Sequence, residues 1–161
     1  MTSQEFRDLR LPLQNARYRL AFVLVKREDD AADITQETIL RLWQKHDEIS
    51  RTLNHKAYCL TAVRNRALTH LQSHESDSEM PESIESPEDI HHAFESRETL
   101  SITERAMEAL PANQKEVIRL SSYAGCTNSE IAQITGLTEV NVRALLSRGR
   151  KRLREIIISY R

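Results

Sequence analysis

Apolar residues recur at three- and four-residue intervals along most of this chain, without the two-residue alternation that is typical of strands. This spacing predicts helices over residues 5–27, 30–45, 56–71, 94–109 and 114–123. Residues 46–55 show no periodicity and predict a loop. Few glycines and prolines interrupt the pattern, so the chain is expected to be all-α.

A further stretch, TNSEIAQITGLTEVNVRALLSRGRKRLR, reads as two helices joined by a tight turn. Thr127 and Glu130 have the spacing of a capping box, in which each side chain bonds the other residue's backbone amide. Gly136 stands where a helix end favours a residue with positive φ. Thr138 is a second N-cap, and a longer helix is expected to begin at Glu139. The pattern is typical of a helix-turn-helix.

The second of these helices has an apolar face and a basic face. Its apolar face comprises Val142, Leu145, Leu146 and Leu153. Its basic residues are Arg143, Arg148, Arg150, Lys151, Arg152 and Arg154. The second helix of a helix-turn-helix lies in the DNA major groove, so this charge favours DNA binding over the alternative of an ordinary solvated helix face. Gly149 lies inside the helix, where it costs about 1 kcal/mol relative to Ala.

Net charge differs sharply between segments of this 161-residue chain, although the total is only −1. Residues 1–72 carry a net +3, residues 73–99 a net −8 and residues 100–161 a net +4. The acidic segment contains two prolines and little to bury, which predicts a flexible, extended linker over residues 73–92. Two small helical domains are therefore expected, over residues 1–72 and 93–161.

The two cysteines, Cys59 and Cys126, lie far apart in the sequence and form neither a disulfide framework nor a metal-binding spacing. We expect reduced thiols, no metal site and no cofactor. No signal peptide or membrane-spanning apolar run is found, which predicts a soluble cytoplasmic protein.

Two helices carry residues that suit binding. The helix over residues 56–71 places Lys56, Tyr58, Arg64 and Asn65 near its exposed side, a combination that suits single-stranded nucleic acid but also occurs on many ordinary surface helices. Trp43, the only tryptophan, is expected mainly in the core, with a partner-facing anchor as the alternative.

Three stretches together carry a family resemblance. DAADITQETILRLWQ, the helix that contains Arg64 and Asn65, and LPANQKEVIRL followed by the helix-turn-helix occur in this order around the acidic segment. The chain thereby resembles the extracytoplasmic-function group of bacterial RNA polymerase sigma factors. The resemblance implies two helical domains without enzymatic activity, which bind core RNA polymerase and direct it to promoter DNA.

The resemblance also implies sites. Binding to the β′ clamp of the polymerase is implied for Asp33, Gln36, Glu37, Leu40 and Trp43. The minus-ten promoter element falls to Asn54, His55, Lys56, Tyr58, Arg64 and Asn65. The minus-thirty-five element is assigned to the C-terminal domain, with contacts implied for Arg143, Ala144, Ser147 and Arg148. Thr138, Asn141 and Lys151 of the same helix-turn-helix are also expected to contact DNA. The β flap of the polymerase and an anti-sigma factor are further implied partners, and no small-molecule substrate is implied.

The sequence departs from the family pattern at Tyr58, where many relatives have Trp, and at Ala144 and Ser147, where they often have larger or more polar residues. The promoter sequence that those relatives recognise therefore cannot be assigned to this chain. A stand-alone dimeric helix-turn-helix regulator would explain only the C-terminal segment. A small nucleic-acid enzyme would need an acid cluster, a nucleophile with its base, or metal spacing, none of which the sequence contains.

Overall fold

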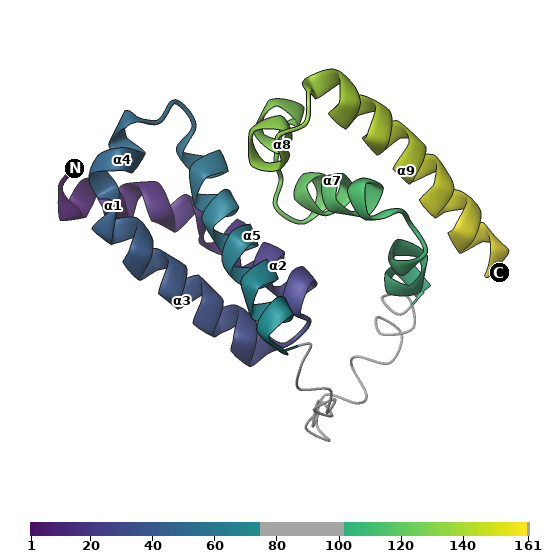
Figure 1. Ribbon diagram of the computed structural model, residues 1–161, viewed down its shortest axis with the longest axis horizontal. Coiled ribbons are helices and arrows are strands. Elements are labelled where there is room, and N and C mark those ends of the chain that lie inside the picture. Colours follow the sequence, from purple (N-terminus) through teal and green to yellow (C-terminus); the bar gives the residue numbers. More distant parts are fainter. Residues whose placement is uncertain (75–101, 161) are drawn as a thin grey trace.

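The structure is a computed structural model that describes residues 1–74 and 102–160 (Figure 1). The regular elements with complete bounds are α1 (Ser3–Arg10), the 3₁₀ helix η1 (Leu11–Leu13), α2 (Gln14–Val25), α3 (Glu28–Gln44), α4 (His46–Arg51), α5 (His55–His74), α7 (Ala112–Ser122), α8 (Asn128–Thr135) and α9 (Glu139–Ser159). Residues 102–108 are also helical. The described residues contain no strand, which confirms the all-α prediction.

Pro12 divides the first predicted helix. One helix was expected over residues 5–27, but α1 ends at Arg10 and α2 begins at Gln14, with η1 between them. Proline has no backbone N–H and its ring clashes with the preceding turn, so the α-helical hydrogen bonds cannot run through it. Lys26 then adopts a left-handed conformation, φ 61°, and ends α2.

The predicted loop over residues 46–55 is also partly helical, because α4 occupies His46–Arg51. Its Ile49 is completely buried. Six residues are too few to reveal a 3.6-residue period, so sequence periodicity could not identify this helix. Only Thr52 to Asn54 remain as a bend between α4 and α5.

The helix-turn-helix forms with the predicted caps. The Thr127 hydroxyl accepts from the Glu130 amide at 3.2 Å, and the Thr127 amide donates to the Glu130 carboxylate at 2.9 Å. Gly136 ends α8 with φ 79°. The Thr138 hydroxyl accepts from the Asn141 amide at 3.1 Å and fixes the start of α9.

Gly149 permits α7 and α9 to pack closely. It is buried on the same face as Val142 and Leu146. A Cβ atom at this position would lie 2.7 Å from Ile118 Cδ1 and 3.3 Å from Gln114 Cβ. Because Gly149 has no side chain, α7 and α9 can lie close together at this point. This close packing explains why a glycine occurs inside α9.

Gly149→Leu is therefore expected to lower the free energy of unfolding by about 3 kcal/mol, because overpacking in a filled core outweighs the gain in helix propensity. Ser147→Leu is the matched control, since Ser147 is exposed on the same helix and should change stability by less than about 0.5 kcal/mol. Chemical denaturation of both variants measures the difference. Equal stabilities would contradict the close-packing explanation.

The helices form two units that share a core. The N-terminal unit comprises α1 to α5, and the C-terminal unit comprises residues 102–160. α5 packs against α8 and α2 against α7 (Figure 1). One continuous cluster of buried residues includes Leu60 and Val63 from α5 and Ile131 from α8. The described parts of the two expected domains therefore pack against each other through buried residues.

The predicted linker over residues 73–92 begins later than expected, since α5 extends to His74. The remainder of that linker, and the first part of the helix predicted over residues 94–109, lie outside the described residues. None of the helices in the described ranges has both the length and the apolar character needed to cross a bilayer.

Candidate nucleic-acid interface

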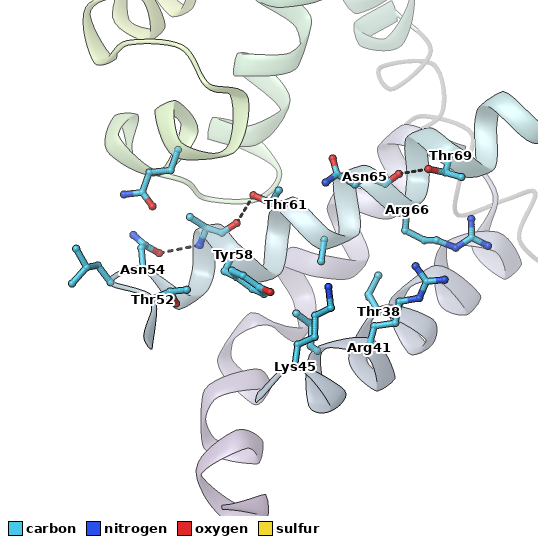
Figure 2. A pocket seen from close by; sticks show the side chains of 15 residues that line it. Thr38, Arg41, Lys45, Thr52, Asn54, Tyr58, Thr61, Asn65, Arg66 and Thr69 are labelled. Carbon is cyan, nitrogen blue, oxygen red and sulfur yellow. Dashed lines mark hydrogen bonds between the residues drawn. The ribbon is translucent and has the colours of Figure 1, made fainter. Parts of the chain in front are cut away.

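A cavity of about 960 Å³ opens between α3, α5 and the bend that precedes α5 (Figure 2). We call it the α3–α5 cavity. Among the residues that line it are Arg41, Lys45, Asn54, Tyr58, Asn65 and Arg66. Three of the predicted DNA-binding residues, Asn54, Tyr58 and Asn65, are thus brought together with cations from a second helix.

The lining of this cavity suits an anionic polymer with exposed bases. It contains no Asp, Glu, His or Cys. Arg41 and Lys45 are exposed and have no ion-pair partner among the residues that the structure describes. Arg66 Nε instead donates to Glu37 Oε2 at 2.6 Å. Cations that follow a phosphate backbone, an aromatic ring and amides are the groups that hold single-stranded nucleic acid.

Tyr58 is held in place by its hydroxyl, which lies 3.2 Å from Glu48 Oε2 of α4 and donates to it. Burial and this hydrogen bond raise the pKa of Tyr58, so the phenol keeps its proton at neutral pH. The helix that the sequence analysis missed, α4, therefore fixes the ring at the edge of the cavity.

Lys56 and Asn54 reach the C-terminal unit rather than open solvent. Lys56 Nζ donates to the Gly125 carbonyl at 2.6 Å and lies 3.4 Å from Glu130 Oε1. Asn54 Nδ2 donates to Glu130 Oε2 at 3.2 Å, while its own Oδ1 accepts from the Ala57 amide. In this arrangement of the two units, Lys56 is thus partly buried and engaged at the contact between them.

Glu130 joins the local fold to the contact between units. The residue is only 8% exposed, and its two carboxylate oxygens serve both the Thr127 cap and the side chains of Asn54 and Lys56. Burial raises the pKa of this carboxyl, but the bonds from Thr127 and Asn54 and the charge of Lys56 outweigh it, so the pKa is lowered overall. Glu130 therefore remains ionised at neutral pH.

Two further ion pairs cross the same contact. Arg64, the remaining cation predicted to bind DNA on α5, donates to Glu116 of α7. Lys26 Nζ lies 3.0 Å from Glu108, and the hydrogen bond from Lys26 lowers the pKa of that carboxyl. These two pairs, with the bonds of Asn54 and Lys56, form what we call the inter-unit contact. Arg64 is consequently directed away from the α3–α5 cavity.

The recognition helix α9 has its core face and its outer face on opposite sides. Val142, Leu146 and Gly149 face the core. At 100° per residue, the stripe opposite them comprises Val140, Ala144, Ser147 and Lys151. Val140 was not predicted as a contact residue, but its side chain is 68% exposed in the first turn after the Thr138 cap.

A smaller hollow, of about 310 Å³, lies between the start of α8 and one flank of α9. It is lined by Asn128, Arg143, Leu146, Ser147, Arg150 and Arg154. Arg143, predicted to contact DNA, thus shares this hollow with Arg150 and Arg154 from the basic face of the same helix. Asn141 and Arg148 are exposed on α9, and His55 begins α5 and is half-buried.

The predicted polymerase-binding residues share the outer face of α3. Asp33, Gln36, Glu37, Leu40 and Trp43 are all exposed. The opposite side of the helix supplies the buried Ala31, Ile34, Thr35, Thr38 and Leu42. Trp43 is 37% exposed, with its ring edge-on to Phe6 at 5.2 Å and stacked on His46 at 4.5 Å. The ring therefore packs on the fold and still presents surface to a partner.

Both cysteines are free and buried, as expected for reduced thiols. Burial raises the pKa of Cys59 and of Cys126 to about 11, which keeps the thiols protonated and unreactive at neutral pH. Within the described residues, no group of three or more His, Cys, Asp or Glu side chains is placed to hold a metal ion.

Sequence reasoning missed Arg41 and Lys45, since they were assigned to no role. A signal was present: both lie on the side of α3 next to Thr38 and Leu42, at spacings of three and four residues. Only the packing of α3 against α5 shows that this side faces the same cavity as Tyr58 and Asn65.

Two family models match the chain. Residues 11–76 match Sigma-70 region 2, and residues 100–153 match Sigma-70, region 4. The first match covers α2 to α5, and the second covers α7, α8 and most of α9. Apart from Gln133 of α8, the lining of the cavity thus lies in the first match, whereas α9 lies mostly in the second.

Curated relatives agree with these models. The chain is 26% identical over 154 residues to "Probable RNA polymerase sigma factor RfaY" of Xanthomonas campestris pv. campestris, covering 90% of this chain and 38% of that protein. It is 27% identical to the ECF RNA polymerase sigma factor SigE of Mycolicibacterium smegmatis, covering 89% and 58%. It is 28% identical to the RNA polymerase sigma factor SigV of Bacillus subtilis, covering 85% and 81%. The chain thus spans less than two thirds of the length of the first two relatives.

Solved structures show the same fold. The sigma factor RpoE of Bartonella quintana, solved with the anti-sigma factor NepR, superimposes with a TM-score of 0.72 at 25% identity over 98% of this chain and 99% of that one. CnrH, solved with the cytosolic domain of CnrY, gives a TM-score of 0.73 at 19% identity over 98% and 90%, which supports the fold alone. With both regions matched in order and the fold shared, this chain belongs to the extracytoplasmic-function group of RNA polymerase sigma factors.

Proposed function

We propose that this chain binds core RNA polymerase, recognises promoter DNA and starts transcription of a specific set of genes, acting as a binding factor rather than an enzyme. The observation that carries the proposal is the α3–α5 cavity, whose cations, amides and aromatic ring occur on a matched region 2 without any carboxylate. Its lining suits unpaired DNA and offers no nucleophile with a base.

The proposal assigns a role to each unit. Residues 1–72 would form the domain that binds the β′ clamp through the outer face of α3 and the minus-ten element through the cavity. Residues 93–161 would form the domain that binds the β flap and the minus-thirty-five element, joined to the first by the acidic segment over residues 73–92. A protein with these partners would act in the cytoplasm.

Promoter binding through Lys56 and Arg64 requires the inter-unit contact to open, since both side chains are engaged there. We propose that an anti-sigma factor would bind while the two units are together. RpoE, which shares this fold, was solved with the anti-sigma factor NepR, and CnrH was solved with the cytosolic domain of CnrY.

Run-off transcription tests the proposal. Purified core polymerase is incubated with a pool of randomised promoter templates, with and without this chain. Discrete transcripts are expected only when the chain is present. Sequence-specific binding by a dimer of the chain, without any effect on core polymerase, would instead identify a stand-alone helix-turn-helix regulator.

A further inference from the structure

His46 is the first residue of α4 and follows α3 after a single turn residue. Its ring stacks on the indole of Trp43, with the two ring centroids 4.5 Å apart and an angle of 18° between the planes. Phe6 of α1 contacts the same indole edge-to-face at 5.2 Å. A histidine at the end of a helix commonly bonds one of the last carbonyls. That role needs only a ring nitrogen and leaves the stacking unexplained.

The His46 side chain also bonds the backbone of Trp43. His46 Nδ1 donates to the Trp43 carbonyl oxygen at 2.7 Å, since a carbonyl oxygen can only accept. Carbonyls in the last turn of a helix have no partner within that helix, so this bond satisfies one of them at the end of α3. His46 therefore contacts Trp43 at two points, the backbone and the face of the ring, and the two contacts together restrict how the indole can turn.

Trp43 depends on such support because it is only partly buried. Its side chain is 37% exposed, at the end of the outer face of α3 that carries the predicted polymerase contacts. A side chain that turns freely loses conformational entropy when a partner fixes it, whereas a ring that is already held loses less. An aromatic ring with one face on the fold and the remaining surface in solvent is typical of an anchor that enters a pocket of a partner protein.

We infer that His46 is a positioning residue for polymerase docking, whose stacked ring holds the Trp43 indole in the orientation that core polymerase binds. This inference rests on the proposed function, with α3 as the docking helix. His46 acts through Trp43, so its contribution should disappear when the indole is absent. A residue that contacts polymerase directly would still contribute after Trp43 is removed.

The first measurement uses the fluorescence of the free chain, because Trp43 is the only tryptophan in the sequence. His46→Ala is expected to raise the acrylamide quenching constant about twofold, since one face of the indole loses its cover. His46→Phe keeps a flat ring on the indole and should give the wild-type constant. Ser50→Ala is the matched control, because Ser50 is exposed in α4 and donates to the Asp47 carbonyl at 2.8 Å. This control removes a hydrogen bond from the same helix and should leave quenching unchanged.

The second measurement is a titration of core polymerase with the full chain. His46→Ala is expected to weaken binding about fivefold, because the indole must then be ordered on docking, while His46→Phe and Ser50→Ala should stay within about twofold of wild type. In a Trp43→Ala background, His46→Ala should cause no further loss, since the two changes remove the same interaction. Thermal melting of each variant checks that it is folded.

Three results would overturn the positioning role. The first is unchanged polymerase affinity of His46→Ala together with increased quenching, because the orientation of the ring would then not matter for docking. The second is a loss that persists in the Trp43→Ala background, and the third is a loss that His46→Phe does not restore. A wild-type chain that does not bind core polymerase would instead overturn the proposed function, and the quenching measurement would still report on the stack.

Discussion

Replacing Leu40 with Glu is expected to weaken the binding of this chain to core RNA polymerase about 30-fold, which corresponds to the loss of a contact of about 2 kcal/mol. Leu40 is 65% exposed on the outer face of α3, whose opposite side already supplies the core. A charge placed at the centre of an interface must be desolvated without a partner. Because Leu40 is mostly exposed and belongs to neither buried cluster, the melting temperature should remain nearly unchanged.

Titration of labelled core polymerase with wild type and variant measures this effect, with Leu11→Glu as a control for an exposed leucine outside α3. Leu40 is a cleaner probe than Glu37, since Glu37→Lys would also break the bond to Arg66, which lines the α3–α5 cavity. That pair is half exposed at Glu37 and should be worth less than about 1 kcal/mol in stability. Unchanged polymerase affinity of the folded Leu40→Glu variant would remove α3 as the docking helix.

The second large effect concerns Arg143, whose replacement by Ala should cost about 1–3 kcal/mol of discrimination between specific and scrambled duplexes. Arg143 lies in the early part of α9, where a recognition helix reaches base edges, and an arginine there can bond guanine O6 and N7 together. Lys151→Ala should weaken binding to all sequences alike and reduce the salt slope by about 0.9 for the phosphate contact that is lost.

A salt series with holoenzyme on both duplexes separates these two behaviours. Arg143 lines the same hollow as Arg150 and Arg154, so it could bind a phosphate rather than a base. If Arg143→Ala keeps the full ratio between specific and scrambled DNA, Arg143 holds a phosphate. Base reading would then belong to the outer stripe that includes Val140 and Ala144, whose methyl groups can contact the methyl group of thymine.

The sequence predicted those elements whose signal lies within a few neighbouring residues. The capping box of Thr127 and Glu130, the positive φ of Gly136 and the cap at Thr138 depend on local geometry, and all were confirmed. The exposed face of α3 was also predictable from the sequence. The five residues assigned to polymerase binding, Asp33, Gln36, Glu37, Leu40 and Trp43, recur at helical spacing on one side of the helix.

Features that depend on distant parts of the chain could not be predicted in this way. Gly149 has a reason only when α7 lies against α9, and Arg41 faces a cavity only when α3 lies against α5. The burial of Arg17, whose side chain is 1% exposed and donates to the Arg10 carbonyl at 3.4 Å, likewise depends on how α2 packs in the fold. The engagement of Lys56 by Gly125 likewise joins residues 69 positions apart.

The polar character of the inter-unit contact gives dissolved salt two opposing effects on the free chain. Ions would compete for DNA phosphates with Lys56 and Arg64, which are predicted to bind DNA. They also screen the ion pairs between the units, most strongly the half-exposed pair of Lys26 and Glu108. Added salt would thus free Lys56 and Arg64 from the inter-unit contact while it weakens their binding to DNA. The salt slope of the free chain should consequently be shallower than its number of phosphate contacts requires. In the holoenzyme, where the proposed promoter binding requires the units to be apart, the slope should count those contacts directly.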